Sequence, residues 1–384
     1  MLDQATENRY NYFLFALVFL LLCIGLVMVY SASHHVAYKK LGSDSIYFRF
    51  HFYRILIGLF ALIIAAIIPY NFWLKSARIW LLIGIGLLIA VLILGIKERN
   101  AQRWIEIYSF RFQPVDVLRM ALIFYLCDAM IRKHEYLRKW KEGLLPQLFI
   151  LGLISFLLIK QPDMGSVVIL LAISVVIFIT AGVSLLHLSF VALLTVPIFL
   201  MKHDYHIVRI KDFLDSVING KSLPYQVNQS IISLGSGGFW GKGLDNSTQK
   251  LEFLPEPFTD FIFSIVGEEF GFVGTSVVLF LFLLLILEGF KIARRCPDEA
   301  GALLAVGITT SIGIYAFVNA GVVSNLLPTK GLPMPFISYG GSFMITTLAG
   351  VGILLNISQY NESSLVRRSS HANTMRRSRR WVGR

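Results

Sequence analysis

Long runs of apolar residues constrain the fold of this chain more than any other feature. Segments such as Phe13–Tyr30, Val167–Ile179 and Val277–Leu287 contain no charged side chain. A helix of about 20 apolar residues matches the roughly 30 Å hydrocarbon core of a bilayer. The runs do not alternate with polar residues, which argues against a membrane β-barrel. Charged residues make up only 15% of the chain. This excludes a disordered protein and disfavours a water-soluble enzyme, for which about 25% is usual.

We therefore predict an all-α, polytopic membrane protein with about ten transmembrane helices and one large extracytoplasmic loop. The first apolar run is a full span behind a short polar tail, as in a retained signal anchor. The expected order is an N-terminal tail 1–12, a ten-span domain 13–357 and a basic C-terminal tail 358–384. The expected spans are 13–30, 50–68, 77–96, 116–131, 145–159, 165–181, 184–201, 261–287, 301–323 and 337–357.

The distribution of Lys and Arg predicts the orientation. An even number of spans places both termini on one side. That side carries 18 Lys and Arg residues near the membrane, against 10 in the short loops of the other side. Positive residues are enriched in cytoplasmic loops. We therefore expect both termini in the cytoplasm and loop 202–258 outside it.

The net charge of +12 fits a membrane protein without nucleic-acid binding. Seven arginines follow Leu365, and a basic tail beside a last span usually lies against anionic lipid. No nucleic-acid-reading module accompanies it. The cysteines Cys23, Cys127 and Cys296 have no disulfide or zinc spacing, and no metal site is predicted.

Polar residues near membrane depth are the candidate functional residues, because burying a charge there is costly. They collect at the predicted extracytoplasmic ends of the spans. These residues are Arg103, Gln113, Asp116, Arg119, Asp163, Asp260 and Lys330.

Structural roles remain open for several of them. Asp260 and Asp163 each precede an apolar run and are also suited to cap a helix. Asp116 and Arg119 are three residues apart, so they are also suited to pair on one helical face. A functional alternative is a site for a lipid-linked pyrophosphate. Arg103 and Arg119 would hold phosphate oxygens, and a carboxylate would remove a proton from a sugar hydroxyl.

Six segments give the chain a resemblance to a known family. They are VYSAS at 29–33, FQP at 112–114, QPDMG at 161–165, PYQVNQSIISLGSGGFWGKGL, LPEPFTDFIFSIVGEEFGFVG and LPTKGLPMPFISYGGS. Together they resemble the SEDS family (shape, elongation, division, sporulation) along nearly the whole chain. Leu327–Gly331 looks more like the division members than the elongation members.

The resemblance implies a ten-span peptidoglycan glycosyltransferase of the cytoplasmic membrane. Such enzymes polymerise lipid II outside that membrane with a class B penicillin-binding protein, a transpeptidase. The family's catalytic aspartate corresponds to Asp260. Its substrate-binding positions correspond to Arg103, Gln113, Asp116, Arg119, Asp163, Lys330, Ser338 and Tyr339. Val115, Asp116, Arg119 and Phe258 depart from the usual serine, glutamate, lysine and histidine of the family.

The expected reaction joins two lipid II molecules with Asp260 as the general base. No resident cofactor is expected; a divalent cation, Mg²⁺ or Mn²⁺, would be held mainly by the substrate pyrophosphate. Other expected partners are division or elongation proteins and membrane lipids. The alternatives are an elongation enzyme, a lipid II flippase and a non-catalytic scaffold of the division machinery.

Overall fold

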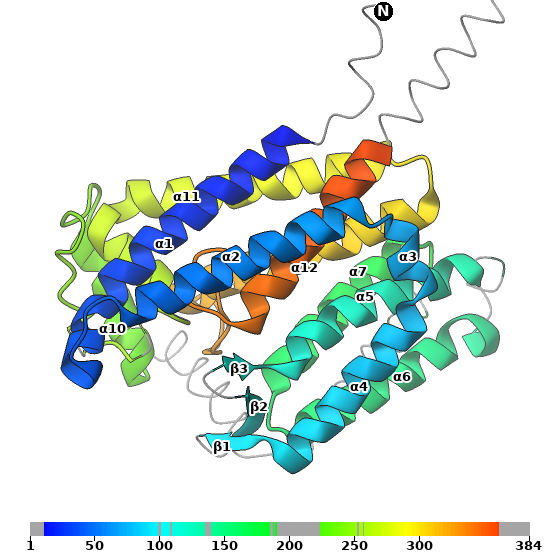
Figure 1. Ribbon diagram of the computed structural model, residues 1–384, viewed down its shortest axis with the longest axis horizontal. Coiled ribbons are helices and arrows are strands. Elements are labelled where there is room, and N and C mark those ends of the chain that lie inside the picture. Colours follow the sequence, from blue (N-terminus) through cyan, green and yellow to red (C-terminus); the bar gives the residue numbers. More distant parts are fainter. Residues whose placement is uncertain are drawn as a thin grey trace, which may run out of the picture.

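The computed structural model describes most of the 384-residue chain. The described residues are 11–98, 101–107, 110–133, 135, 140–184, 187, 189, 223–251, 253–255 and 257–360. They form a mostly helical protein whose long helices run side by side (Figure 1).

The first half of the chain contains five helices and a small sheet. These elements are α1 (Tyr12–Leu41), α2 (Ile46–Ile67), α3 (Tyr70–Lys75), α4 (Ala77–Leu94), β1 (Ile96–Glu98), β2 (Ala101–Ile107), β3 (Phe110–Phe112) and α5 (Pro114–Arg132).

The second half is helical in its described part. Its elements are a π-helical turn (Trp140–Leu144), α6 (Leu145–Lys160), α7 (Met164–Thr180), α10 (Tyr225–Gly237), α11 (Ile262–Arg295), α12 (Glu299–Val323) and a C-terminal helix (Ser342–Tyr360).

The helices confirm a multi-pass membrane protein. Seven helices of the described part are long and apolar enough to cross a bilayer, and α7 is a shorter apolar helix. α5 lies at the predicted fourth span and carries Asp116 and Arg119. Most of the predicted span 184–201 and the first part of the loop, residues 202–222, lie outside the described residues. The count of ten spans therefore stays a prediction.

One sequence prediction about the fold was wrong. The first span was expected to end at residue 30, but α1 continues to Leu41 and ends at Gly42, whose φ is +68°. At about 1.5 Å per residue, its 30 residues exceed the thickness of the hydrocarbon core. For residues 97–111, which follow the third span, no secondary structure was predicted from the sequence. Described residues of this segment contribute to an antiparallel sheet of order β1-β2-β3, in which Ile105 pairs with Phe112.

α12 lies at the centre of the bundle. It packs against α11, α5 and α7, and 78% of its most apolar stretch is buried. By contrast, only 28% of the corresponding stretch of α4 is buried. In Figure 1, α1, α2 and α11 lie toward one side and α4, α5, α6 and α7 toward the other. α4 is thus a peripheral helix, and α12 joins the two groups.

α11 is interrupted at Gly271. The loop after α10, residues 238–251, replaces the helical hydrogen bonds that are lost there. Gly271 has φ +66° and ψ −160°. Four backbone hydrogen bonds join the loop to the helix: Lys242 N–H to Glu268 O (2.9 Å), Gly243 N–H to Glu269 O (2.9 Å), Phe272 N–H to Gly238 O (2.9 Å) and Val273 N–H to Phe239 O (3.2 Å). Irregular backbone at membrane depth persists only where protein satisfies its polar groups. The loop therefore fixes the first part of α11.

Gly271→Ala should destabilise the protein. A Cβ at this position would collide with the backbone of Phe239 and Gly241, and φ +66° disfavours any other residue. We expect a loss of about 1–3 kcal/mol, measured as a lower thermal unfolding midpoint in detergent. The matched control is Gly152→Ala in α6, where a Cβ meets no neighbour and the midpoint should hold or rise. Equal midpoints for the two variants would show that the loop and helix are not tightly joined.

Candidate functional site

Asp260 lies in a half-buried turn just before α11. The helix begins at Ile262, and its N-cap is Phe261, whose side chain makes no capping hydrogen bond. The N-cap position thus belongs to Phe261 and not to Asp260. The turn instead contacts the non-helical segment between α12 and the C-terminal helix, which we call the 324–341 segment.

Three hydrogen bonds hold the Asp260 turn on the 324–341 segment and α12. Tyr339 N–H donates to Phe258 O (2.9 Å), and Ser338 Oγ donates to Thr259 O (2.6 Å). Asn319 Nδ2 of α12 donates to Asp260 O (2.8 Å). The carboxylate itself lies against Gly331, where any Cβ would collide with Oδ2 of Asp260. The position of the carboxylate thus depends on the backbone that follows Lys330.

Asp163 caps α7 and also contacts Arg103. Its Oδ2 accepts from Ser166 Oγ (2.7 Å), and its Oδ1 accepts from Ser166 N–H (3.4 Å), so the capping interpretation is confirmed. Arg103 Nη1 lies 3.8 Å from Asp163 Oδ1. The guanidinium also donates to the carbonyls of Gln161 and Pro162. Strand β2 thereby holds Arg103 against the turn between α6 and α7.

Lys330 lies close to both this ion pair and the Asp260 turn. A Cβ on Gly165 would lie 3.4 Å from Lys330 Cδ and 3.7 Å from Asp163 Oδ1. The next residue, Gly331, touches the Asp260 carboxylate. The structure thus brings Arg103, Asp163, Lys330 and Asp260 into one group, which we call the Asp260 group. All but Asp163 are partly exposed.

The Gln113–Arg119 stretch lies mainly inside the protein. Ser342 Oγ accepts from Gln113 N–H (3.0 Å) and donates to Asp116 Oδ2 (2.6 Å). Arg119 is 1% exposed and donates to Thr347 Oγ1 (2.9 Å). Its guanidinium also stacks on the rings of Tyr315 and Phe343.

The spacing of Asp116 and Arg119 suggested a direct ion pair. These two described residues do not form one. Each charge instead uses hydroxyl groups at the start of the C-terminal helix. A role for Arg119 in phosphate binding stays a prediction.

Ser338 and Tyr339 contact the Asp260 turn from the other side. Ser338 is 2% exposed, and its hydroxyl accepts from Met334 N–H (2.7 Å) while donating to the turn. The ring of Tyr339 is half-buried, with the Arg54 guanidinium 4.4 Å from its centroid. Ser338 therefore supports the turn, whereas Tyr339 lies at its partly exposed side.

The buried carboxylates of Glu268 and Glu269 have a role that was not predicted from the sequence. Two acidic residues inside an apolar run were the available signal. Glu268 is fully buried and accepts hydrogen bonds from Ser233, Ser236, Lys242, Ser247, Thr248 and Gln249. Glu269 accepts from Ser31 Oγ (2.5 Å) and Lys250 Nζ (3.1 Å). Together they fasten the loop before Asp260 to α11 and α1.

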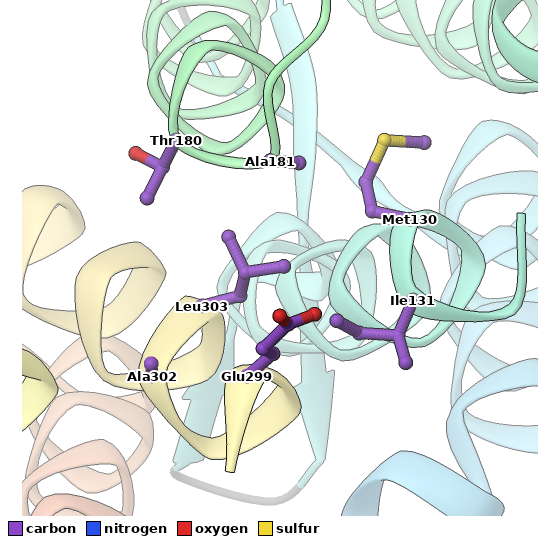
Figure 2. A pocket seen from close by; sticks show the side chains of 7 residues that line it. All are labelled: Met130, Ile131, Thr180, Ala181, Glu299, Ala302 and Leu303. Carbon is purple, nitrogen blue, oxygen red and sulfur yellow. The ribbon is translucent and has the colours of Figure 1, made fainter. Parts of the chain in front are cut away.

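A cavity lies at the opposite ends of the same helices. It has a volume of about 220 Å³ and is formed by the last turns of α5 and α7 and the first turn of α12. Figure 2 shows its mostly apolar lining, with the carboxylate of Glu299. None of the predicted site residues lines it.

Glu268→Ala should unfold the protein at a markedly lower temperature. The change leaves several buried donors and the Lys242 ammonium without their acceptor. Leaving one buried donor without its acceptor costs about 1–3 kcal/mol, and Glu268 accepts from several such donors. Thermal unfolding in detergent measures the loss. Asp44→Ala, at an exposed carboxylate between α1 and α2, is the control and should stay within about 0.5 kcal/mol. A Glu268→Ala midpoint as high as that of the control would contradict the anchoring role.

Comparison with known proteins identifies the family. Residues 11–363 match the family of cell cycle proteins that comprises FtsW, RodA and SpoVE. The chain belongs to this family, as the sequence predicted.

Relatives and solved structures agree with this assignment. The chain is 41% identical over 358 residues to a probable peptidoglycan glycosyltransferase FtsW of Geobacter metallireducens, covering 91% of this chain and 95% of the relative. It is 35% identical to stage V sporulation protein E of Bacillus subtilis, covering 89% and 95%. A peptidoglycan synthase complex contains a similar chain, with a TM-score of 0.73, 24% identity and coverage of 92% and 98%. RodA of Thermus thermophilus gives a TM-score of 0.68 at 25% identity, covering 91% and 96%.

Proposed function

We propose that this protein is a peptidoglycan glycosyltransferase that polymerises lipid II into glycan strands for septal synthesis during cell division. Relatives 36–41% identical to it carry the name peptidoglycan glycosyltransferase FtsW. The observation that supports the chemistry most directly is the Asp260 group. It combines a half-buried carboxylate with two cationic side chains at one end of the bundle.

In the proposed reaction, Asp260 removes the proton from the 4-hydroxyl of the acceptor sugar. That oxygen attacks the anomeric carbon of the donor, whose configuration inverts, and the polyprenyl pyrophosphate leaves. A general base must lie within about 2.6–3.2 Å of the proton-bearing oxygen, directly or through one water. The contact with Gly331 sets the position of the carboxylate for this step.

The cationic side chains of the group would stabilise the leaving pyrophosphate. Arg103 presents a planar fork that suits two phosphate oxygens, and Asp163 together with the carbonyls of Gln161 and Pro162 orients it. Lys330 adds a point charge beside it. A divalent cation, Mg²⁺ or Mn²⁺, would be held mainly by the pyrophosphate itself.

The protein would act in the cytoplasmic membrane beside a transpeptidase. We propose that a class B penicillin-binding protein crosslinks the strands that this protein makes. The similar chain in the solved peptidoglycan synthase complex, described as coordinating polymerization and crosslinking, supports such a pairing. The excess of Lys and Arg supports an orientation with both termini in the cytoplasm. Asp260 would then face the outer side, where glycan strands form.

Asp260→Asn should abolish glycan synthesis while leaving the fold intact. Asparagine keeps the size and much of the hydrogen bonding but cannot accept the proton. Loss of a general base typically lowers the rate by about 10²–10⁴-fold. Labelled lipid II with the purified protein and its transpeptidase measures glycan strands directly. The control is the unfolding midpoint and transpeptidase binding of the variant, which should match those of the original protein. A fully active Asp260→Asn variant would contradict the proposal. So would an original protein that moves lipid II across the membrane but makes no glycan strands.

Cysteine labelling should establish the orientation. On a background without the three native cysteines, Asn246→Cys in the loop before Asp260 is exposed and should react with an impermeant maleimide added to intact cells. Ser364→Cys, in the predicted cytoplasmic tail, should react only after permeabilisation. The reverse pattern would place Asp260 in the cytoplasm and exclude strand synthesis outside.

A further inference from the structure

Asn319 joins two segments that are distant in sequence. Its side chain lies in the last part of α12 and is 1% exposed. Nδ2 donates to Asp260 O (2.8 Å) and to Leu332 O (2.6 Å). One amide group thus holds the turn that carries Asp260 and the backbone that follows Lys330 and Gly331.

These two bonds explain why an amide occupies this position. Both acceptors are backbone carbonyls of non-helical segments, and an NH₂ group supplies two donors. Oδ1 of Asn319 is buried without a hydrogen-bond partner among the described residues. A buried unpaired acceptor costs about 1–3 kcal/mol. Packing alone would therefore favour an apolar residue, so the presence of asparagine points to the two bonds.

We propose that Asn319 is a positioning residue for catalysis, an inference that rests on the proposed function of Asp260. It sets the turn against Gly331, where the carboxylate meets the backbone without room for a Cβ. Ser338 and Tyr339 hold Thr259 and Phe258 of the same turn independently. Loss of Asn319 therefore shifts the carboxylate without releasing the whole turn. A misplacement of about 1 Å can lower the rate of a reaction by about 10²-fold.

The test combines single and double variants in the lipid II polymerisation assay. Asn319→Leu should lower kcat by about 10–100-fold and change KM by less than about threefold, because the substrate-holding side chains stay in place. Asn319→Ser keeps one donor, so its kcat should lie between those of the original protein and Asn319→Leu. It replaces the leucine variant in the test if that variant fails to fold. The matched control is Thr310→Val, which removes another buried polar atom of α12 that has no hydrogen-bond partner. It should retain full activity.

A double variant separates positioning from general destabilisation. In the Asp260→Asn background, Asn319→Leu should cause no further loss of the residual rate, because Asn319 acts through the carboxylate. A merely structural role would lower the residual rate by the same factor as in the original protein. An equal loss in both backgrounds would overturn the inference. Full activity of Asn319→Leu, or an effect of this variant on KM alone, would overturn it as well. If Asp260→Asn is itself fully active, the proposed function of Asp260 fails first, and the two failures are thus distinguished.

Discussion

The hydrogen bonding of one buried, non-helical stretch determines how the Asp260 group is built. Between α12 and the C-terminal helix, the 324–341 segment leaves helical geometry while Leu332 and residues 334–338 stay buried. In a membrane protein, each unpaired backbone group costs several kcal/mol, because lipid offers no partner. Side chains supply the missing partners: Ser338 bonds Met334 N–H, and Asn319 bonds Leu332 O. The same two side chains bond the Asp260 turn, so the segment and the turn form one unit.

The loop before Asp260 follows the same physical logic. Its backbone satisfies α11 where Gly271 interrupts the helix, and Glu268 accepts hydrogen bonds from the loop's side chains and backbone. Lys250 and Ser31 then tie Glu269 to the loop and to α1. The turn that bears Asp260 is therefore fixed on both sides. A general base benefits from this, because its distance to the substrate oxygen is set before the substrate binds.

The sequence was most informative where one element decides its own structure. The predicted spans 77–96, 145–159 and 301–323 match α4, α6 and α12 within two residues at each end, because apolar runs determine membrane helices locally. The extension of α1 was missed because its apolar run ends at Tyr30, whereas Ser31 beyond it bonds Glu269, which is 238 residues away. The role of Asn319 was missed for the same reason, because its acceptors are set by tertiary structure.

Exposure separates charged residues that the sequence placed in one class. The cost of burying a charge drew attention to Asp116, Arg119, Arg103, Asp260 and Lys330 alike. In the structure, Asp116 and Arg119 are at most 3% exposed and engage hydroxyl groups of the C-terminal helix, as structural charges do. The other three are partly exposed and meet around Gly331 and Asp163. A group that exchanges a proton or holds a phosphate has to reach its substrate. The proposed proton transfer therefore uses the partly exposed residues, and the buried charges bind the helices that carry them; a role of Asp116 and Arg119 toward the substrate stays a prediction.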